Sequence, residues 1–367
     1  MQSSIMGESP RQVRMTSSPY QQLPTQSFWK TAVVQSSPYC LEGIYSKKYK
    51  ITGQMKIATA GSCFAQHISK NLAANGFSLL DLEPPPVGLP EDEHSKYGYS
   101  MYSARYGNIY TIRQLRQLAQ ECAGLFKPAH YAWKKGDHFI DAMRPGVEPI
   151  GFNTVDELVS ARRYHLERVK TMFQEMDVFV FTLGLTEMWS DAESGTVYPL
   201  APGTAGGKYD QKSHLFVNAG FHDILQDYYT FESSLDIIRN KRPFKVLLTV
   251  SPVPLTATAA HQHILVSTTY SKSVLRAVAG YLSQAHDHID YFPSYELVTN
   301  PRLHSTAFTD NLRSVRNEIV SLVMSHFFAE HKPISTQSRD TEKNMTKQKS
   351  QQTRLQCEEA LLEAFGK

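Results

Sequence analysis

Two potential nucleophiles stand side by side in the chain, because the Ser62 hydroxyl and the Cys63 thiol directly follow Gly61. Glycine at this point permits a sharp turn and the close approach of a substrate. Several hydrolase folds present their catalytic serine on a turn between a strand and a helix. An ordinary turn with a serine helix cap has the same local pattern. Adjacent side chains on a turn point in different directions, so only one of the two nucleophiles should face a cleft.

The residues on either side of this turn predict a strand before it and a helix after it. Residues 56–60 are compatible with a strand, and Phe64, Ile68 and Leu72 fall on one helical face. In an open parallel sheet, the turn then lies at the carboxyl end of a strand, where ligands bind. The helix N-terminus beside it favours developing negative charge. A thiol there could also become reactive, which keeps Cys63 as the rival nucleophile.

Longer motifs resemble one protein family. The string GSCFA over residues 61–65 is the signature that names the GSCFA domain family, and co-linear matches run from about residue 19 to about residue 328. They are PYQQLPTQSFWK (19–30), YGNIYT (106–111), FVFTLGLTEMW (179–189), LLTVSPVPLTAT (247–258), TTYSKSVLRAVA (268–279) and YFPSYE (291–296). The family is similar to a branch of the SGNH, or GDSL-type, esterase and acyltransferase superfamily. The resemblance selects Ser62 over Cys63 as the catalytic nucleophile.

The resemblance also implies where the oxyanion is held. In the superfamily the donors are the serine's own amide, a glycine in a second sequence block and an asparagine in a third. The matching oxyanion or substrate-positioning residues here are Gly107 and Asn108 in the second block and Gly184, Thr186 and Glu187 in the third. Thr186 replaces the usual asparagine, and its hydroxyl donates one hydrogen bond without the reach of an amide. Glu187 could orient a histidine, bind a substrate hydroxyl or cap the loop after its strand.

The catalytic base departs from the superfamily pattern. No Asp-X-X-His motif occurs near residues 300–314, where Arg313 stands in the expected histidine position. Arginine cannot act as a base at neutral pH. Two histidines are available as substitutes: His263, after the strand and the SPVPLT turn, and His304, before the last helix. The family pattern favours His263 as the base and leaves His304 as the alternative.

Other residues suggest less chemistry. The pairs His261 with His263 and His286 with His288 have spacing that can bind zinc, but a third ligand is not visible nearby, so we expect no metal. Ester hydrolysis through Ser62 also needs no organic cofactor. The four cysteines have no paired spacing, which argues against a disulfide framework. Lys272 in the TTYSKS motif should help to fix its helix against the sheet, although it could also contact an anionic substrate.

Composition narrows the class of protein. The chain has 367 residues, of which 41% are hydrophobic and 20% charged, so it can bury a substantial core. Its net charge of +3 without a long basic block gives no reason to expect nucleic acid as a partner. The polar N-terminus lacks the apolar core of a signal peptide, and no apolar run approaches the length of a membrane span. We therefore expect a cytoplasmic protein without a membrane partner, of open oligomeric state.

Strand patterns separated by helical runs predict an α/β fold: a three-layer α/β/α sandwich with a mostly parallel sheet and SGNH-hydrolase, flavodoxin-like architecture. Residues 123–151 read as irregular and residues 195–218 as a loop. Helices are predicted to start at Thr154, Phe231, Thr268 and Asn311. The predicted organisation is a disordered N-terminus (1–18), an arm that wraps the domain (19–51), the GSCFA/SGNH-like domain (52–330), a flexible linker (331–352) and a short C-terminal helix (353–367).

These observations favour a serine-dependent acyl-ester hydrolase or O-acyltransferase. It would act through an acyl-Ser62 intermediate on an acylated substrate, most simply an acetylated glycan or small metabolite. The departures at Thr186 and Arg313 keep a second hypothesis open. In it, the chain is a non-catalytic ligand-binding or partner-recruiting domain that retains the SGNH fold. Whether a histidine comes within hydrogen-bond reach of the Ser62 hydroxyl distinguishes the two hypotheses.

Overall fold

The computed structural model describes residues 18–303, 305–331, 355 and 357–366, and the chain divides into two compact units. The first unit, Met1–Ile44, contains a 3₁₀ helix, η1 (Thr25–Ser27), and a π-helix, η2 (Lys30–Val34). The second unit, Tyr45–Lys367, contains all other elements. The predicted disordered segment 1–18 and the predicted linker 331–352 lie outside the described residues, apart from Ser18 and His331, and so does His304.

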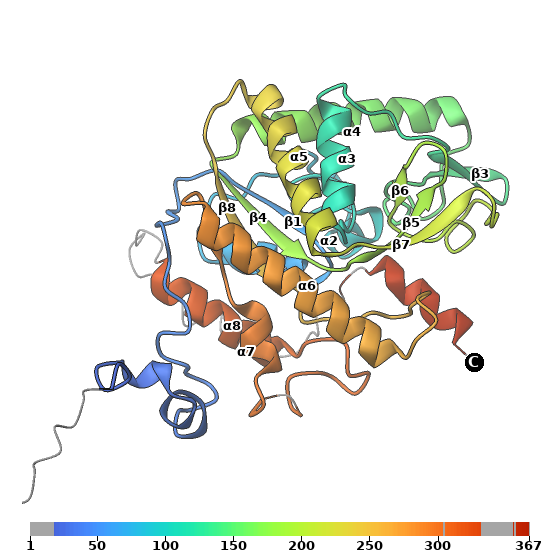
Figure 1. The fold of residues 1–367 in the computed structure, drawn as a ribbon. Helices are drawn as coiled ribbons and strands as arrows, with labels where there is room; N and C mark the ends of the chain where they lie inside the picture. Colours follow the sequence, from blue (N-terminus) through green and yellow to red (C-terminus); the bar gives the residue numbers. More distant parts are fainter. Residues whose placement is uncertain (1–17, 304, 332–354, 356, 367) are drawn as a thin grey trace, which may run out of the picture. The chain divides into compact units, whose positions relative to one another are not determined.

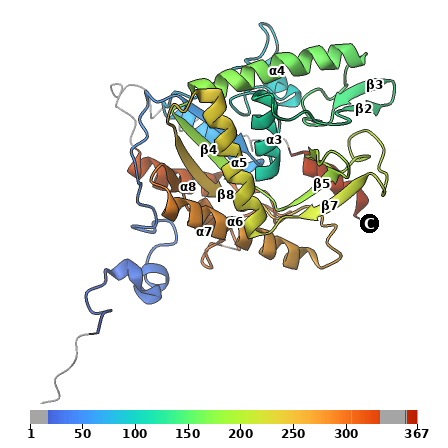
Figure 2. The same cartoon turned by 45° about the horizontal axis from the view of Figure 1, so that its top comes forward.

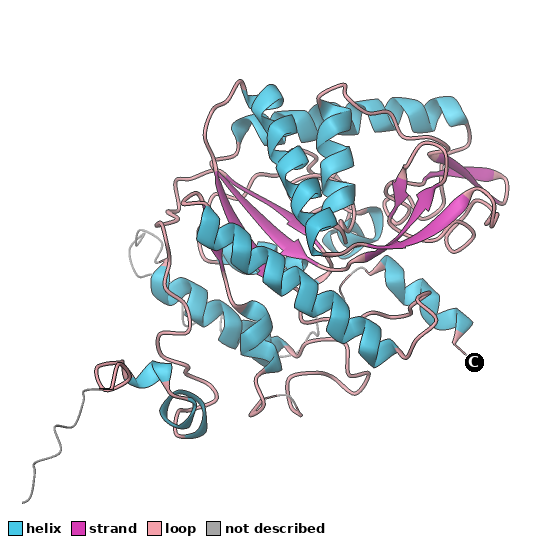
Figure 3. Cartoon of the chain, viewed as in Figure 1, coloured by secondary structure: helices cyan, strands magenta, loops and turns pink. Residues whose placement is uncertain are grey.

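A four-stranded parallel sheet forms the centre of the second unit (Figure 1; strands are magenta in Figure 3). Its strand order is β1 (Ile57–Gly61), β4 (Val178–Leu183), β8 (Lys245–Val250) and β9 (Ile289–Tyr291). Every side chain of β1 and β4 is buried, as expected for strands covered on both faces. The register pairs Gly61 with Thr182, so the turn after β1 begins beside the carboxyl end of β4.

Helices cover both faces of this sheet, which confirms the predicted α/β class with a mostly parallel sheet (Figures 1 and 2). One face packs in a common core with α3 (Ile112–Cys122), α4 (Val155–Glu175), α5 (Phe221–Arg239) and α6 (Ile264–Ala285). The other face contacts α1 (Phe64–Ala74) and α7 (Ser294–Thr299), and α8 (Asn317–Glu330) packs on these two helices. The predicted apolar face of α1 is buried at Phe64, Ile68 and Leu72.

Two segments that were predicted to be irregular contain antiparallel strands instead. Residues 123–151 include a hairpin of β2 (Ala132–Lys135) and β3 (His138–Asp141). Residues 195–218 include β6 (Val197–Tyr198) and β7 (His214–Asn218), which flank β5 (Glu187–Asp191). Pairing with β5 supplies the backbone hydrogen bonds that the local pattern of glycine and proline does not predict.

Several helix boundaries also differ from the prediction, for local reasons. α5 begins at Phe221 rather than Phe231, because Asp223 accepts a hydrogen bond from the Gly220 amide at 2.9 Å. α6 begins four residues before Thr268. α8 begins at Asn317 rather than Asn311, since the Asn311 side chain accepts the amides of Arg313 and Ser314 and holds a turn there.

Three short helices complete the second unit: α2 (Glu91–His94), η3 (Ser95–Tyr97) and η4 (Glu358–Phe365), a 3₁₀ helix near the C-terminus (red in Figure 1). None of the helices in the described ranges is both long and apolar enough to cross a membrane.

Candidate active site

The turn after β1 buries Ser62 at the carboxyl edge of the sheet. Gly61 has φ +138°, and a β-carbon there would lie 2.5 Å from the Thr182 carbonyl oxygen, so only glycine fits. The Ser62 amide donates to the same carbonyl oxygen at 3.2 Å. It is therefore engaged, although the resemblance assigns it to the oxyanion. Ser62 is 3% exposed, and its Oγ has no hydrogen-bond partner among the described residues.

Three sequence blocks meet at this serine. A β-carbon on Gly184 would lie 2.9 Å from the Ser62 Cβ and 3.0 Å from the Tyr110 carbonyl oxygen. The Ile109 amide donates to the Gly61 carbonyl oxygen at 2.9 Å, and the Leu185 amide donates to Tyr110 at 2.9 Å. The predicted second block, which contains Gly107 and Asn108, and the third block, which begins at Gly184, therefore lie against the turn at Ser62. The absence of a side chain at Gly184 makes this approach possible.

Asn108 is fixed beside the backbone of Ser62. The Tyr102 hydroxyl lies 2.5 Å from Asn108 Oδ1 and 3.0 Å from the Ser62 carbonyl oxygen. With its amide oxygen held by Tyr102, Asn108 presents its amide nitrogen as a donor. Gly107 precedes it with φ +68°, a left-handed conformation that favours glycine. The predicted positioning roles of Gly107 and Asn108 are thus compatible with their placement.

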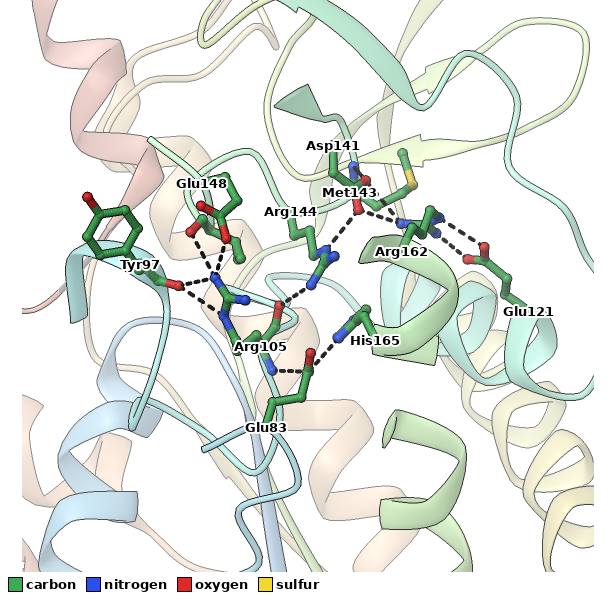
Figure 4. A network of polar contacts seen from close by, with 11 residues as sticks. Glu83, Tyr97, Arg105, Glu121, Asp141, Met143, Arg144, Glu148, Arg162 and His165 are labelled. Atoms are coloured by element: carbon green, nitrogen blue, oxygen red, sulfur yellow. Dashed lines mark hydrogen bonds and ion pairs between the residues drawn. The ribbon is translucent and has the colours of Figure 1, made fainter. Parts of the chain in front are cut away.

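A buried network of charged residues holds the backbone segment that leads to Gly107 (Figure 4). The Arg105 guanidinium donates to Glu148 at 2.6 Å, and its backbone amide donates to Glu83 at 2.7 Å. Arg144 donates to the Arg105 carbonyl oxygen at 3.2 Å. His165 Nδ1 lies 2.6 Å from the same Glu83 carboxylate. These contacts fix the approach to the site from four separate parts of the chain.

Asp141 is the central anion of this network. Arg144 Nε lies 2.8 Å from its carboxylate, and Arg162 Nη1 lies 3.0 Å from both of its oxygens. Burial alone would raise the pKa of Asp141, but these two guanidinium groups lower it to about 2. Arg162 also pairs with Glu121 of α3, so the network links α3, α4 and the β2–β3 hairpin (Figure 4).

Lys272 is a buried cation bonded to Gly184, the residue that packs against Ser62, and sequence reasoning assigned it only a minor role. It is 2% exposed, and its Nζ donates to the Gly184 carbonyl oxygen at 2.7 Å. Burial lowers the pKa of Lys272 to about 8, against the opposing effects of Glu359 and Cys63. The family motif TTYSKS was the sequence signal that could have drawn attention to Lys272. The neighbouring Ser271 of this motif also contacts the third block, since its hydroxyl accepts the Thr186 amide at 3.1 Å. A lysine with a lowered pKa can accept a proton near neutral pH.

Thr186 and Glu187, the other two predicted site residues of the third block, form hydrogen bonds with residues other than Ser62. The Thr186 hydroxyl donates to Asn218 Oδ1 at 2.7 Å. The Glu187 carboxylate accepts the Thr258 hydroxyl at 2.7 Å. Neither contact points to Ser62, so their predicted roles at the oxyanion or the substrate stay predictions without support from these contacts.

Among the described residues, no hydrogen bond joins the predicted base His263 to the Ser62 hydroxyl. His263 caps α6, because its Nδ1 accepts the Leu265 amide at 3.2 Å, and its side chain is exposed. His304, the alternative, lies outside the described residues. Arg313, in the position expected for a histidine, donates to Glu363 at 3.0 Å and lies near Glu359.

Cys63 is an unfavourable nucleophile in this arrangement. A hydrogen bond with Cys357, and then burial, raises the pKa of the Cys63 thiol well above its usual value. The same hydrogen bond lowers the pKa of Cys357 to about 7. All four cysteines of the chain are free. Of this pair, the thiol with the lower pKa is therefore the one from the C-terminal segment.

The C-terminal segment enters the site, which local sequence patterns did not indicate. Glu358 accepts hydrogen bonds from the Asn108 side-chain amide and, at 2.9 Å, from the Tyr110 hydroxyl. Glu359 is 6% exposed, and its amide lies 3.4 Å from the same hydroxyl.

A cavity of about 430 Å³ adjoins this segment, within the size range of small-molecule sites. Its lining includes Cys63, His67, Arg313, Asn317 and Cys357. His67 is buried, and burial lowers its pKa to about 4.

No group of three or more metal-ligating side chains with suitable placement occurs within the described ranges. Of the two predicted His-X-His pairs, His286 contacts the Tyr229 hydroxyl at 3.1 Å and His288 contacts Glu232 at 2.8 Å. These histidines make ordinary polar contacts between the α6–β9 connection and α5.

Comparisons with known proteins give one family and one weak structural likeness. A family model described as the GSCFA family matches residues 56–327, which is most of the chain. No curated protein sequence matches. A crystal structure of a carbohydrate esterase family 3 from Talaromyces cellulolyticus shares 8% sequence identity with this chain. That match covers 76% of this chain and 96% of the other, with a TM-score of 0.36.

Proposed function

The chain belongs to the GSCFA family, and we propose that it is a carboxylic-ester hydrolase or O-acyltransferase with SGNH-like architecture and Ser62 as its nucleophile. The observation that carries this proposal is the Ser62 Oγ, which is buried and has no hydrogen-bond partner within the described ranges. Burying a hydroxyl without a hydrogen-bond partner costs free energy, so a buried hydroxyl of this kind calls for an explanation such as a catalytic role. It lies on a strand-to-helix turn against Gly184, whose carbonyl oxygen accepts a hydrogen bond from Lys272, a lysine of lowered pKa.

Lys272 is the base that the geometry favours, in place of the predicted His263. Its Nζ bonds to Gly184, the residue that packs against the Ser62 side chain. In the neutral form, the amine takes the Ser62 proton directly or through one water as Oγ attacks the acyl carbonyl carbon. Serine with lysine as base is a known variant of nucleophilic catalysis.

The Asn108 side-chain amide holds the oxyanion that forms in this attack. Donors aimed at the developing charge in a buried site lower the barrier by several kcal/mol. Collapse of the tetrahedral intermediate expels the alkoxide, which takes the proton from Lys272. The acyl-Ser62 intermediate then reacts with water in a hydrolase or with an acceptor hydroxyl in a transferase. The cavity of about 430 Å³ favours a small acylated substrate, such as an acetylated sugar or metabolite.

The proposal is tested by trapping the intermediate. Full-length protein is mixed with p-nitrophenyl acetate, quenched in acid and digested, and the acetylated peptide is mapped by mass spectrometry. We expect acetyl on Ser62 and none in Ser62→Ala. A correctly folded protein that hydrolyses no activated ester and carries no acetyl group would contradict the proposal.

One observation favours a second candidate, a binding domain without catalysis. The C-terminal segment already fills the donor cradle at Asn108 and Tyr110, as a recruited ligand would. This candidate predicts a site that binds carboxylates and never acylates Ser62, so the trapping experiment separates the two.

A further inference from the structure

The C-terminal segment, residues 357–366, places a carboxylate in a cradle of hydrogen-bond donors. The Glu358 side chain accepts from the Asn108 side-chain amide and the Tyr110 hydroxyl. Burial raises the pKa of Glu358, while the backbone amides of Asn108 and of Glu358 itself act in the opposite direction. These are the donors of a site built for a carboxylate or an oxyanion.

Two glycines leave the space that this carboxylate occupies. A β-carbon on Gly146 would lie 2.8 Å from Glu358 Oε1, and one on Gly107 would lie 3.2 Å from the same atom. Gly107 also has a positive φ, whereas Gly146 does not. At Gly146 the reason for glycine is therefore space for the Glu358 carboxylate and not the backbone conformation.

The next carboxylate of the segment lies near the half-buried guanidinium of Arg313. Glu359 Oε2 lies 3.9 Å from Arg313 Nη2. Burial raises the pKa of Glu359 to about 8, and Arg313 and Lys272 act against that rise. Glu359 in turn favours the protonated form of Lys272. The docked segment thus fills the cradle. Its Glu359 also disfavours the neutral form of Lys272, which the proposed catalysis requires.

A third relationship brings the segment to the turn that carries Ser62. The Cys357 and Cys63 side chains line the same cavity, and each shifts the pKa of the other. Residues 332–354 connect His331 to Leu355, and 24 peptide steps can span up to about 80 Å. A single chain is therefore long enough to reach its own site.

We propose that residues 357–363 are an internal ligand of the Ser62 site, with the Glu358 carboxylate in the subsite that receives the carboxylate product of ester hydrolysis. The identification of the subsite with the product rests on the proposed function, whereas the occupancy itself does not. The segment competes with acylated substrates, and the ligands of the vacated cradle are small monocarboxylates.

Occupancy is tested without any assay of activity. Full-length protein is oxidised with glutathione disulfide, which is reduced to two glutathione molecules as Cys63 and Cys357 form a disulfide. Non-reducing peptide mapping should show this disulfide within one chain, with Cys40 and Cys122 as internal controls. It should be strongly diminished in Glu358→Lys, which expels the segment, and kept in Ala364→Lys, which adds a lysine at an exposed position.

Competition is tested by the rate at which a fluorophosphonate labels Ser62. We expect Glu358→Lys to label about tenfold faster than wild type, since charged hydrogen bonds are lost, and Ala364→Lys to match wild type. The oxidised wild type should resist labelling until it is reduced. This measurement on the unmutated chain tests the competition even if Glu358→Lys fails to fold.

The outcomes separate the two proposals. A Cys63–Cys357 disulfide without labelling in any variant supports the internal ligand and contradicts the serine enzyme. Equal labelling in all variants with no such disulfide overturns the internal ligand and leaves the enzyme. Disulfides found only between chains overturn an internal ligand, because the segment then binds in a second copy.

Discussion

Lys272 Nζ donates a hydrogen bond of 2.7 Å to the carbonyl oxygen of Gly184. Gly184 in turn packs directly against the side chain of Ser62. Buried Lys272 therefore helps to hold Gly184 in place, and burial lowers the pKa of its amine to about 8. The mechanism that we propose depends on this lowered pKa, because the neutral amine accepts the Ser62 proton.

Lys272 should therefore set the pH dependence of Ser62 reactivity. The pKa of Lys272 is lowered to about 8, so the neutral amine is scarce below that pH and dominant above it. We expect the rate of fluorophosphonate labelling to rise about tenfold per pH unit below pH 8 and to level off above it. Lys272→Met should lower the rate by about 10²- to 10⁴-fold. Lys272→Arg keeps the cation but not the base, so wild-type labelling in that variant would refute the role.

Asn108 should matter more for the reaction than for the fold. Removal of one oxyanion donor costs about 10²- to 10³-fold in rate in comparable sites. We expect Asn108→Ala to lower the hydrolysis of p-nitrophenyl acetate by such a factor, with kcat affected more than KM. Asn75→Ala, at the exposed end of α1, is the matched control and should keep wild-type rates. A loss confined to KM would point to substrate binding instead.

Gly184 should tolerate no side chain. Its β-carbon would lie 2.9 Å from Ser62 Cβ and 3.0 Å from the Tyr110 carbonyl oxygen, a contact with backbone that must move. We expect Gly184→Ala to cost about 1–3 kcal/mol of unfolding free energy in urea and to abolish labelling of Ser62. Gly220→Ala, with φ −84° and a nearest contact of 3.5 Å, should cost only about 0.5 kcal/mol through the poorer helix N-cap and should leave the labelling of Ser62 unchanged. Equal losses in both variants would argue against close packing as the cause.

Asp141 should make stability depend on acid. Its folded pKa is lowered to about 2, below the ordinary 3.8, so its stabilisation is present above pH 4 and is lost as the pH falls toward 2. The expected contribution is about 2 kcal/mol. Asp141→Asn should lower the free energy of unfolding at pH 7, and the difference from wild type should shrink in acid. A constant difference from pH 7 to pH 3 would contradict the assignment.

Local patterns were sufficient to predict the nucleophile turn. Strand-compatible residues before Gly61 and one apolar helical face after it describe β1, the turn and α1 correctly. The central strands were predicted for the same reason, because fully buried strands are continuous apolar runs. The same reasoning failed for residues 195–218, because β7 depends on pairing with β5 rather than on its own composition.

The polar side chains around the Ser62 turn could not be predicted from local patterns. Lys272 lies in an amphipathic helix, where lysine is usually exposed, and only the packing of α6 on the sheet buries it. Glu358 lies 250 residues from Asn108, so their contact has no signal in a single sequence. His263 was chosen from the family pattern, but the start of α6 uses it as a helix cap.

The most direct test of the central claim is the site of fluorophosphonate labelling in the full-length protein and in Glu358→Lys, mapped by mass spectrometry. We predict an adduct on the Ser62 hydroxyl, faster in Glu358→Lys, absent in Ser62→Ala and retained in Cys63→Ala. An adduct confined to Cys63, or no adduct in two correctly folded proteins, would contradict Ser62 as an activated nucleophile.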